Sequence, residues 1–483
     1  MRKNYSYIDL FSGCGGLSLG LENVGFSLSL AVEKSSMAAE TFYHNFIKRI
    51  EDKNEWSKFC GLPLIEQAKQ GLVINELSAV LEEESLLKKF RKEGVDLVAG
   101  GPPCQGFSIA GLRNPNDQRN KLPWQFLQFI ENVNPKAVIM ENVLGMKKSF
   151  RNQKGLSTFE QVRLALEQTG KGYVVQPLEL NAMNFGVPQN RSRVILVGIR
   201  KDIARKVGIN STRHIWKSDL DVAESLLFNE KPSLAPNPKF KHSDARKVKD
   251  AFWDINEDGY AFDLDYQKYK NNDGEYARLM RDKNYWAPFN NSTCKVEGSI
   301  LLNHNKRNHS EQVRERFMLY QYLSSQGITT KVLNIPSSRN NVKSSFDELR
   351  SILSCAQFPA KNKAGVRLAM NLDELAQLVI NLNTRKHSQR PLIWDLPSPT
   401  MVSLPDDFVH PIIPRTLSVR EMARIQSFPD AFEFRSKETT GSHRRRFEVP
   451  QYTQVGNAVP PLMARAVGEV IFEILNKFAE MGG

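Results

Sequence analysis

Short apolar runs and amphipathic stretches alternate along the first 200 residues. The apolar runs predict strands at Tyr7–Phe11, Ser27–Val32, Val95–Ala99, Ala137–Met140, Tyr173–Leu180 and Arg193–Ile199. Helical spacing predicts one helix that begins after Gly16 and stops at Gly25, and another over Trp124–Val133. Because strands that alternate with helices indicate parallel βαβ units, we expect an α/β fold with a doubly wound, mostly parallel sheet.

The pattern weakens between residues 201 and 395, where polar and aromatic residues mix without a repeat. In residues 301–395, 14 basic side chains stand against 7 acidic ones. Order returns with a short helix over Val419–Gln426 and a terminal amphipathic helix over Pro460–Lys477, which begins with proline. The chain is therefore expected to divide into residues 1–200, a second and smaller domain of residues 201–395, and residues 396–483 that return to the first part.

Composition narrows the class of protein. The 483 residues are 41% hydrophobic and 25% charged, which is typical of a globular chain. There is no apolar run near the ~18 residues of a membrane span, and the chain enters its first strand without a signal-peptide pattern, so we expect no membrane contact and a cytoplasmic location. Five cysteines without metal-ligand spacing predict neither a disulfide framework nor a metal site. The net charge of +13 fits a polyanionic partner, or equally a merely basic enzyme.

A glycine-rich turn, Phe11-Ser-Gly-Cys-Gly-Gly-Leu17, follows the first strand. Such a turn lets a ligand approach the backbone at a helix N-terminus. The dinucleotide fingerprint fails, because Ser18 stands where its third glycine belongs. Glu33, twenty residues beyond Gly13, is placed to accept hydrogen bonds from a ribose. The pattern favours a nucleoside without a pyrophosphate, such as S-adenosylmethionine, over the alternative of a purely structural turn.

A second loop, Gly100-Gly-Pro-Pro-Cys-Gln-Gly-Phe-Ser108, follows a buried strand. The carboxyl ends of parallel strands form the edge at which ligands bind in open α/β sheets. Cys104 projects from this rigid loop, where cationic neighbours would favour a nucleophilic thiolate. The alternative is a small buried residue without chemistry.

Three charged residues lie at further strand ends. Glu141, in Glu141-Asn-Val143, could share a proton with a ring nitrogen, or could simply cap a helix. Arg191 and Arg193 alternate at strand spacing and are expected on one face, where they suit a phosphate, a carboxylate or a carbonyl oxygen, unless they are an ordinary surface pair. A turn at Gly456-Asn457 before the last helix is another place where backbone groups could meet a ligand.

Together these blocks resemble the DNA (cytosine-5)-methyltransferase family, most closely its prokaryotic modification methylases. Gly101-Pro-Pro-Cys104, Glu141-Asn-Val143 and Gln189-Asn-Arg-Ser-Arg193 resemble the family's nucleophile, acid and arginine motifs in the family's order. Leu396–Met401, Ser418–Asp430 and Gln454–Pro461 resemble its closing blocks. Residues 201–390 match none of the family's sequence motifs. In the family, the variable target-recognition domain lies in this part of the chain.

The resemblance implies an enzyme that moves a methyl group from S-adenosylmethionine to C5 of a flipped cytosine in a specific duplex sequence, through an adduct between Cys104 and C6. Glu141 would be the acid partner, and Arg191 and Arg193 would hold the base and its phosphate. The implied cofactor site is lined by Phe11, Gly13, Gly15, Gly16, Leu17, Glu33, Pro103, Leu122, Asn457 and Val459. The family's aspartate for the adenine amino group has no clear counterpart, and Asn75 and Glu76 are the nearest candidates. The resemblance implies a monomer that acts on double-stranded DNA, with a cognate restriction endonuclease that acts on the same sequence.

Three other functions stay open from the sequence. A nicotinamide-dependent dehydrogenase would share the first strand, turn and acid, although Ser18 and the cysteine loop argue against it. A DNA-binding protein with a degenerate methylase fold would have lost Cys104 or the Glu141 block, and both are present. An RNA methylase would look similar in its catalytic part, and the large basic second domain favours duplex DNA over it.

Overall fold

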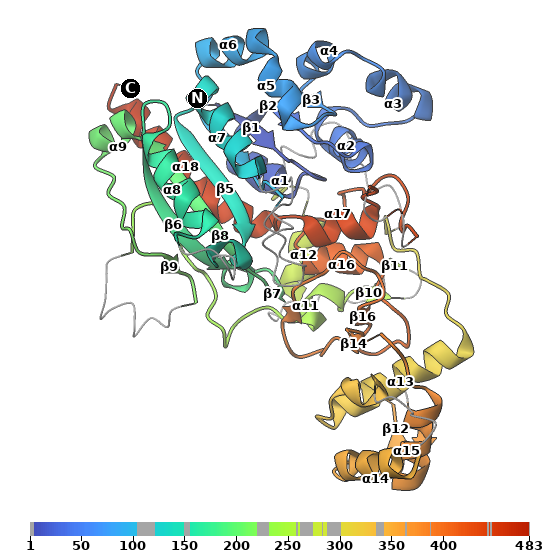
Figure 1. Ribbon diagram of the computed structural model, residues 1–483. Coiled ribbons are helices and arrows are strands. Elements are labelled where there is room, and N and C mark those ends of the chain that lie inside the picture. Colours follow the sequence, from blue (N-terminus) through green and yellow to red (C-terminus); the bar gives the residue numbers. More distant parts are fainter. Residues whose placement is uncertain are drawn as a thin grey trace.

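An eight-stranded sheet forms the centre of the larger body in the computed structural model (Figure 1). The structure describes residues 4–103, 121–148, 155–219, 231–256, 259–260, 274–282, 284–286, 301–334, 342–362, 365–386, 388–441, 444 and 447–482. The strand order is β3-β2-β1-β4-β5-β8-β6-β9, and every neighbouring pair is parallel except those that β8 forms with β5 and β6. The strands are β1 (Tyr5–Leu10), β2 (Phe26–Val32), β3 (Leu72–Val73), β4 (Leu97–Gly100), β5 (Ala137–Val143), β6 (Tyr173–Asn181), β8 (Ser192–Arg200) and β9 (Trp216–Lys217). The predicted α/β fold with a mostly parallel sheet is therefore confirmed.

Helices cover both faces of this sheet and continue into the rest of the chain. Their bounds are α1 (Gly16–Val24), α2 (Ser36–Phe42), α3 (Lys53–Cys60), α4 (Leu64–Lys69), α5 (Leu77–Glu82), α6 (Glu84–Glu93), α7 (Leu122–Val133), α8 (Thr158–Gln168), α9 (Lys201–Val207), α11 (Val248–Phe252), α12 (Glu275–Arg281), α13 (Glu311–Ser325), α14 (Val342–Leu353), α15 (Leu372–Asn381), α16 (Val419–Ile425), α17 (Gln451–Asn457) and α18 (Pro461–Glu480). Short strands pair outside the main sheet as β7 (Gln189–Asn190) with β15 (Ser398–Pro399), β10 (Ile255–Asn256) with β11 (Gly259–Tyr260), β12 (Ala360–Lys361) with β13 (Arg367–Ala369), and β14 (Arg390–Pro391) with β16 (Phe408–Val409).

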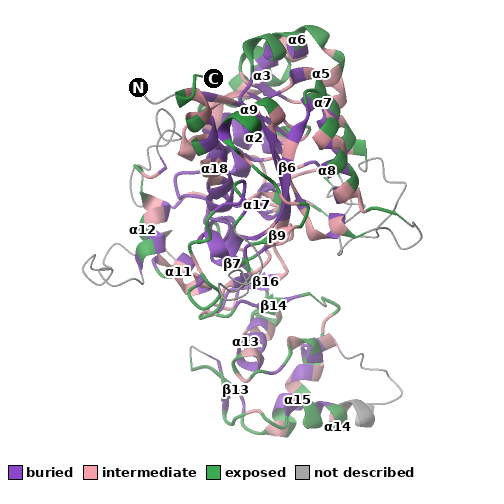
Figure 2. Ribbon diagram, turned by 90° about the vertical axis from the view of Figure 1, so that its left-hand side faces the viewer, coloured by how far each residue is buried: buried purple, intermediate pink, exposed green. Residues whose placement is uncertain are grey.

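Successive strand residues alternate between two hydrophobic cores, because side chains of a strand point to opposite faces. Leu97 and Ala99 enter the core that α1, α9 and α18 cover, while Val98 enters the core under α5, α6, α7 and α8. Figure 2 shows buried ribbon between helices whose outer sides are exposed. The last helix lies directly on the first one: a Cβ on Gly20 would come within 2.6 Å of Ala464 Cβ. The C-terminal part thus completes the first core.

A small lobe lies apart from the sheet, at the bottom of Figure 1. Its described residues lie within 311–334, 342–362 and 365–382, where α13, α14, α15 and the β12–β13 hairpin enclose a hydrophobic cluster that also contains Val409 of β16. The predicted boundary at residue 200 does not coincide with the end of the sheet, because β9 pairs with β6 and α9 packs in the first core. Part of residues 201–395 therefore belongs to the body, and the rest forms the small lobe and the segments that lead to it.

Candidate active site

The glycine turn after β1 is shaped by backbone conformations that suit glycine. Gly13 and Gly15 have φ of 57° and 99°, and Phe11 also has a positive φ of 62°. A Cβ on Gly13 would meet nothing within 4 Å in the part of the chain that the structure describes, so this side of the turn is open there. A Cβ on Gly15 would lie 2.3 Å from the ring of Phe46, so the other side is filled. The turn can therefore accept a ligand on its Gly13 side.

Glu33, at the end of β2, is fixed against the same turn. Its Oε2 accepts from the backbone N–H of Gly13 at 2.9 Å, and its Oε1 accepts from that of Ser35 at 2.7 Å. Burial raises the pKa of Glu33, and these backbone N–H groups oppose that rise. Each carboxylate oxygen keeps a further lone pair that could accept from a ribose hydroxyl.

Asp9 and Ser12 were not singled out from the sequence. Asp9 Oδ2 accepts from the Ser18 hydroxyl at 2.5 Å, but its Oδ1 and the Ser12 Oγ have no hydrogen-bond partner among the described residues. Burial raises the pKa of Asp9 to about 7, although the Ser18 hydroxyl opposes the rise. Buried polar atoms without a hydrogen-bond partner, next to an open glycine turn, fit a bound molecule that supplies hydrogen-bond donors, such as S-adenosylmethionine. The only sequence signal was a carboxylate inside an otherwise apolar strand.

The opposite wall comes from the C-terminal part of the chain. A Cβ on Gly16 would lie 2.3 Å from the carbonyl oxygen of Val459, so the residues after α17 press on the start of α1. Leu17 is buried there, Val459 is half-buried, and Asn457 is exposed. The prediction of a simple turn at Gly456-Asn457 was wrong, because these two residues end helix α17, whose short, largely buried length gave no periodic signal.

Glu141 lies at the edge of the sheet, within β5. The sequence predicted that this strand would stop at Met140, but its pairing with β8 continues to Val143. Because β8 is antiparallel, its first residues reach the same edge, and Arg193 is paired with Val143. Arg193 Nε contacts Glu141 Oε1 at 2.9 Å. Burial raises the pKa of Glu141 above its ordinary value, with Arg193 and Arg191 opposing the rise.

The loop after β4 reaches the same carboxylate. A Cβ on Gly101 would lie 3.0 Å from Glu141 Oε2, and Asn142 Nδ2 donates to the carbonyl of Pro102 at 3.1 Å. Pro103 is exposed and is the last described residue before Cys104, which lies outside the described residues. Leu122 begins α7, one turn before Phe126, whose ring a Cβ on Gly100 would touch at 3.1 Å. The structure thus brings the loop that leads to Cys104 against Glu141.

Arg191 does not share the contacts of Arg193. Its side chain is buried, and its Nη1 donates to the carbonyl of Met401 at 3.2 Å. Its Nη2 donates to the carbonyls of Gly456 and Ala458 at 3.0 and 3.1 Å. The pattern predicted that both arginines face one ligand, whereas their hydrogen bonds diverge, because Arg191 lies between β7 and β8 and only Arg193 lies in β8.

The two candidates for the adenine contact lie after β3, at the outer end of the same edge. Asn75 and Glu76 are both exposed, and Glu76 forms an exposed ion pair with Lys34, the residue after Glu33. Both candidates are therefore on the Glu33 side of the turn.

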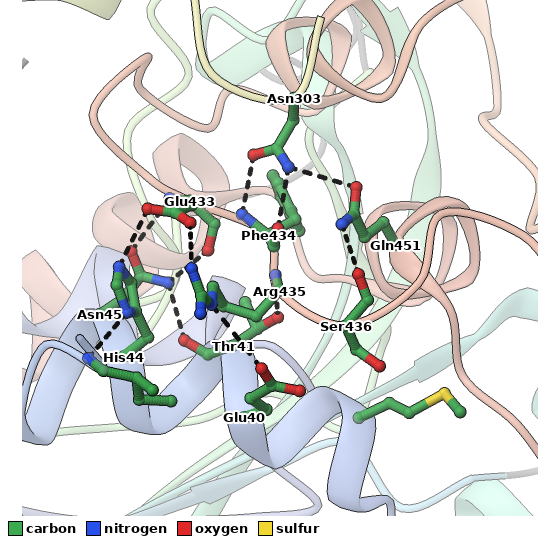
Figure 3. A network of polar contacts seen from close by, with 12 residues as sticks. Glu40, Thr41, His44, Asn45, Asn303, Glu433, Phe434, Arg435, Ser436 and Gln451 are labelled. Carbon is green, nitrogen blue, oxygen red and sulfur yellow. Dashed lines mark hydrogen bonds and ion pairs between the residues drawn. The ribbon is translucent and has the colours of Figure 1, made fainter. Parts of the chain in front are cut away.

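A polar network holds the segment before α17 against α2 and the π-helix Tyr43–Ile47 (Figure 3). His44 Nε2 contacts Glu433 Oε2 at 3.1 Å, while His44 Nδ1 accepts from the backbone N–H of Ile50. Asn303 exchanges two hydrogen bonds with the backbone of Phe434, at 2.8 and 2.9 Å. These contacts join three distant stretches of sequence and fix the position from which α17 reaches the glycine turn.

A family model of C-5 cytosine-specific DNA methylases matches residues 5–473. The chain belongs to this family. The chain is 30% identical over 476 residues to the type II methyltransferase M.DdeI of Desulfomicrobium norvegicum, covering 97% of this chain and 89% of that protein. It is also 30% identical over 485 residues to the type II methyltransferase M.AgeI of Thalassovita gelatinovora, covering 96% and 98%.

A solved structure supports the fold of this cytosine-5 methylase. It is described as a DNA modification methyltransferase encoded within a prophage of E. coli, and it is 21% identical, with a TM-score of 0.56 over 98% of this chain and 99% of that one. The protein is a DNA (cytosine-5)-methyltransferase of the type II modification kind. Among the described helices, none is long and apolar enough to cross a membrane. No group of three metal-ligating side chains gathers within the described part of the chain.

Proposed function

We propose that this methylase acts on a cytosine turned out of its duplex, through a covalent adduct of Cys104. The observation that carries the proposal is the position of Glu141, whose carboxylate contacts both Arg193 and the loop that leads to Cys104. Inside a duplex, C6 of cytosine is shielded by stacked neighbours, so the base must leave the helix at a cost of roughly a few kcal/mol.

The residues at the sheet edge then activate a ring carbon that is by itself a poor nucleophile. The thiolate of Cys104 adds to C6, and Glu141, whose pKa burial raises, holds a proton toward N3 and stabilises the negative charge that the addition places on the ring. The electron pair of the resulting enamine lies at C5, which takes the methyl group while the donor sulfonium becomes a thioether. A base removes the C5 proton, and the C6–S bond breaks to release the thiolate.

S-adenosylmethionine is the methyl donor that the first turn fits. Glu33 would accept from the ribose hydroxyls, the open side of Gly13 would admit the nucleoside, and the segment through Val459 would close the opposite wall. We extend the same assignment to Phe11, Gly15, Gly16, Leu17, Pro103, Leu122 and Asn457.

Residues 201–395 would select the DNA sequence. Lys361 and Arg367 on the β12–β13 hairpin of the small lobe are exposed and form no ion pair with the described residues. Such side chains suit phosphate contacts, which set the register in which others read base edges. We further propose that the enzyme is a monomer that protects DNA from a restriction endonuclease of the same specificity.

The function is tested by incubating the protein with methyl-labelled S-adenosylmethionine and DNA of mixed sequence, and then mapping the label. We expect the label on C5 of cytosine within one short sequence. A Cys104→Ser variant should bind the same duplex and transfer nothing. Label on an exocyclic nitrogen, or transfer by the variant at the wild-type rate, would contradict the proposal.

A further inference from the structure

Three buried polar side chains lie between the sheet edge and the C-terminal part of the chain. Gln189, Arg191 and Gln426 are each at most 2% exposed, and we call them the Arg191 cluster. Gln189 Nε2 donates to Gln426 Oε1 at 2.8 Å, and Gln189 Oε1 accepts from the backbone N–H of Met401 at 2.8 Å. The cluster is thus built from two motifs that are more than 200 residues apart.

This cluster holds the backbone at the end of α17. Arg191 donates to the carbonyls of Gly456 and Ala458, and Gln426 Nε2 donates to that of Val455 at 2.8 Å. Side chains therefore bind three carbonyls at the end of α17, and the Val455 carbonyl also accepts from the backbone N–H of Ala458 at 3.2 Å. Charge-assisted hydrogen bonds of a guanidinium are among the stronger ones available for such a purpose.

The segment that is held in this way is the wall of the donor site. The Val459 carbonyl, one residue beyond the last contact of Arg191, lies where a Cβ on Gly16 would be within 2.3 Å. A Cβ on Gly456 would come within 2.6 Å of the Val402 backbone, so the segment has little room to move on its other side. Loss of the cluster would free the wall to withdraw from the glycine turn.

The same stretch of chain carries Arg193, one member of the pair that would face the base. Arg193 lies two residues after Arg191 and contacts Glu141, and its Nη1 donates to the carbonyl of Ser192 at 2.8 Å. Arg191 also lies close enough to Glu141 that its charge opposes the rise in the pKa of that carboxyl. The donor wall and the base site are therefore joined through three consecutive residues.

We propose that Arg191 is a positioning residue, which sets the donor wall through Gly456 and Ala458, rather than a contact to cytosine or phosphate. This role rests on the proposed function for the donor site. Its terminal nitrogens are already engaged by backbone carbonyls in the protein alone, and burial keeps them from a DNA phosphate at the surface.

The test compares Arg191→Met with Arg193→Met, two equal changes that lie two residues apart. Equilibrium binding of labelled S-adenosylmethionine gives the donor Kd, and rates at saturating donor and DNA give kcat. For Arg191→Met we expect the donor Kd to rise at least about tenfold while kcat stays within roughly fivefold, since the hydrogen bonds of Arg191 go to the donor wall. For Arg193→Met we expect the reverse, a fall in kcat with the donor Kd unchanged.

An unchanged donor Kd in Arg191→Met, with a loss of kcat or of DNA affinity, would overturn the proposal, because Arg191 would then touch the base or a phosphate. If Arg191→Met fails to fold, Gln426→Leu removes the Val455 contact and is judged by the same split between Kd and kcat. A wild-type protein that binds no S-adenosylmethionine would overturn the proposed donor site itself, which distinguishes that failure from a failure of the positioning role.

Discussion

The sheet edge and the small lobe use polar residues in opposite ways. At the edge, Glu141 and Arg193 are only 13% and 12% exposed and are held by each other and by neighbouring backbone. On the lobe, Lys361 and Arg367 stand exposed on a two-stranded hairpin. A buried, preoriented group contributes to a reaction step, whereas an exposed charge contributes to association and is screened by salt. Substitutions at the sheet edge should therefore impair the reaction step, whereas substitutions on the lobe should impair association with DNA.

The largest effect is expected at Glu141. Glu141→Gln keeps the size of the side chain and removes the proton that would be held toward N3, so single-turnover methyl transfer should slow by about 10²–10⁴-fold. Duplex affinity should change little. Glu131→Gln, an equal change at an exposed position of α7, is the control and should leave the rate unaffected. A rate for Glu141→Gln equal to that of the control would remove Glu141 from the reaction.

The joint between α11 and α16 in the body depends on Asp254, which lies two residues after α11. Its carboxylate pairs with Arg424, which is fully buried and also contacts Asp430. Asp254→Ala leaves part of a buried charge uncompensated and should lower the free energy of unfolding by about 3–5 kcal/mol, measured by urea denaturation. A decrease of less than about 1 kcal/mol, the size typical of an exposed ion pair, would show that this joint tolerates the unpaired charge.

The contribution of Asp254 to the free energy of unfolding should depend on pH. Burial raises the pKa of Asp254, but the charges of Arg424 and Arg281 outweigh burial and hold it below its ordinary value. An acidic group whose pKa is lower in the folded state than in the unfolded state stabilises the protein at pH values above its unfolded-state pKa. This stabilisation is lost as the pH falls through the folded-state pKa. The difference in stability between the wild type and Asp254→Ala should therefore narrow at strongly acidic pH.

A smaller effect is expected at Glu33. Glu33→Ala removes the acceptor for the ribose and should raise the KM for S-adenosylmethionine about 10–100-fold, as expected when hydrogen bonds to a charged group are removed. The kcat at saturating donor should change less than the KM. Glu82→Ala, at an exposed position of α5, should leave both unchanged. An unaltered KM in Glu33→Ala would exclude this carboxylate from the donor site.

The smallest effect on the rate is expected from the lobe. Changing both Lys361 and Arg367 to glutamine should weaken duplex binding and reduce the slope of log Kd against log salt by about 0.9 for each phosphate that is no longer neutralised. The kcat at saturating DNA should be retained. Lys89 and Lys92 on α6, changed in the same way, remove the same charge at the opposite end of the molecule (Figure 1). Equal slopes in the two double variants would mean that the hairpin does not bind DNA.

The same contrast explains what the sequence could predict. Glu33 and Glu141 follow from strand ends, since parallel strands deliver their carboxyl ends to one edge. The direction of Arg191 could not be predicted, because its partners are carbonyls of residues 401–458 that only the fold brings near. The sequence pattern also did not predict the helices of the lobe. In α13 the successive residues Tyr320, Gln321, Tyr322 and Leu323 are all buried, so the helix lacks the one-sided hydrophobic pattern by which an amphipathic helix is recognised.

The most direct test of the account is a search for the adduct between Cys104 and DNA. A duplex that carries 5-fluorocytosine at the mapped position cannot lose a proton from C5 after methyl transfer, so the C6–S bond should persist. With S-adenosylmethionine present, we predict a denaturation-resistant complex whose peptide mass places the modified base on Cys104, and no complex with Cys104→Ser. A wild-type enzyme that methylates cytosine at C5 in ordinary duplex but never forms this complex, or forms it through another residue, would contradict the central claim.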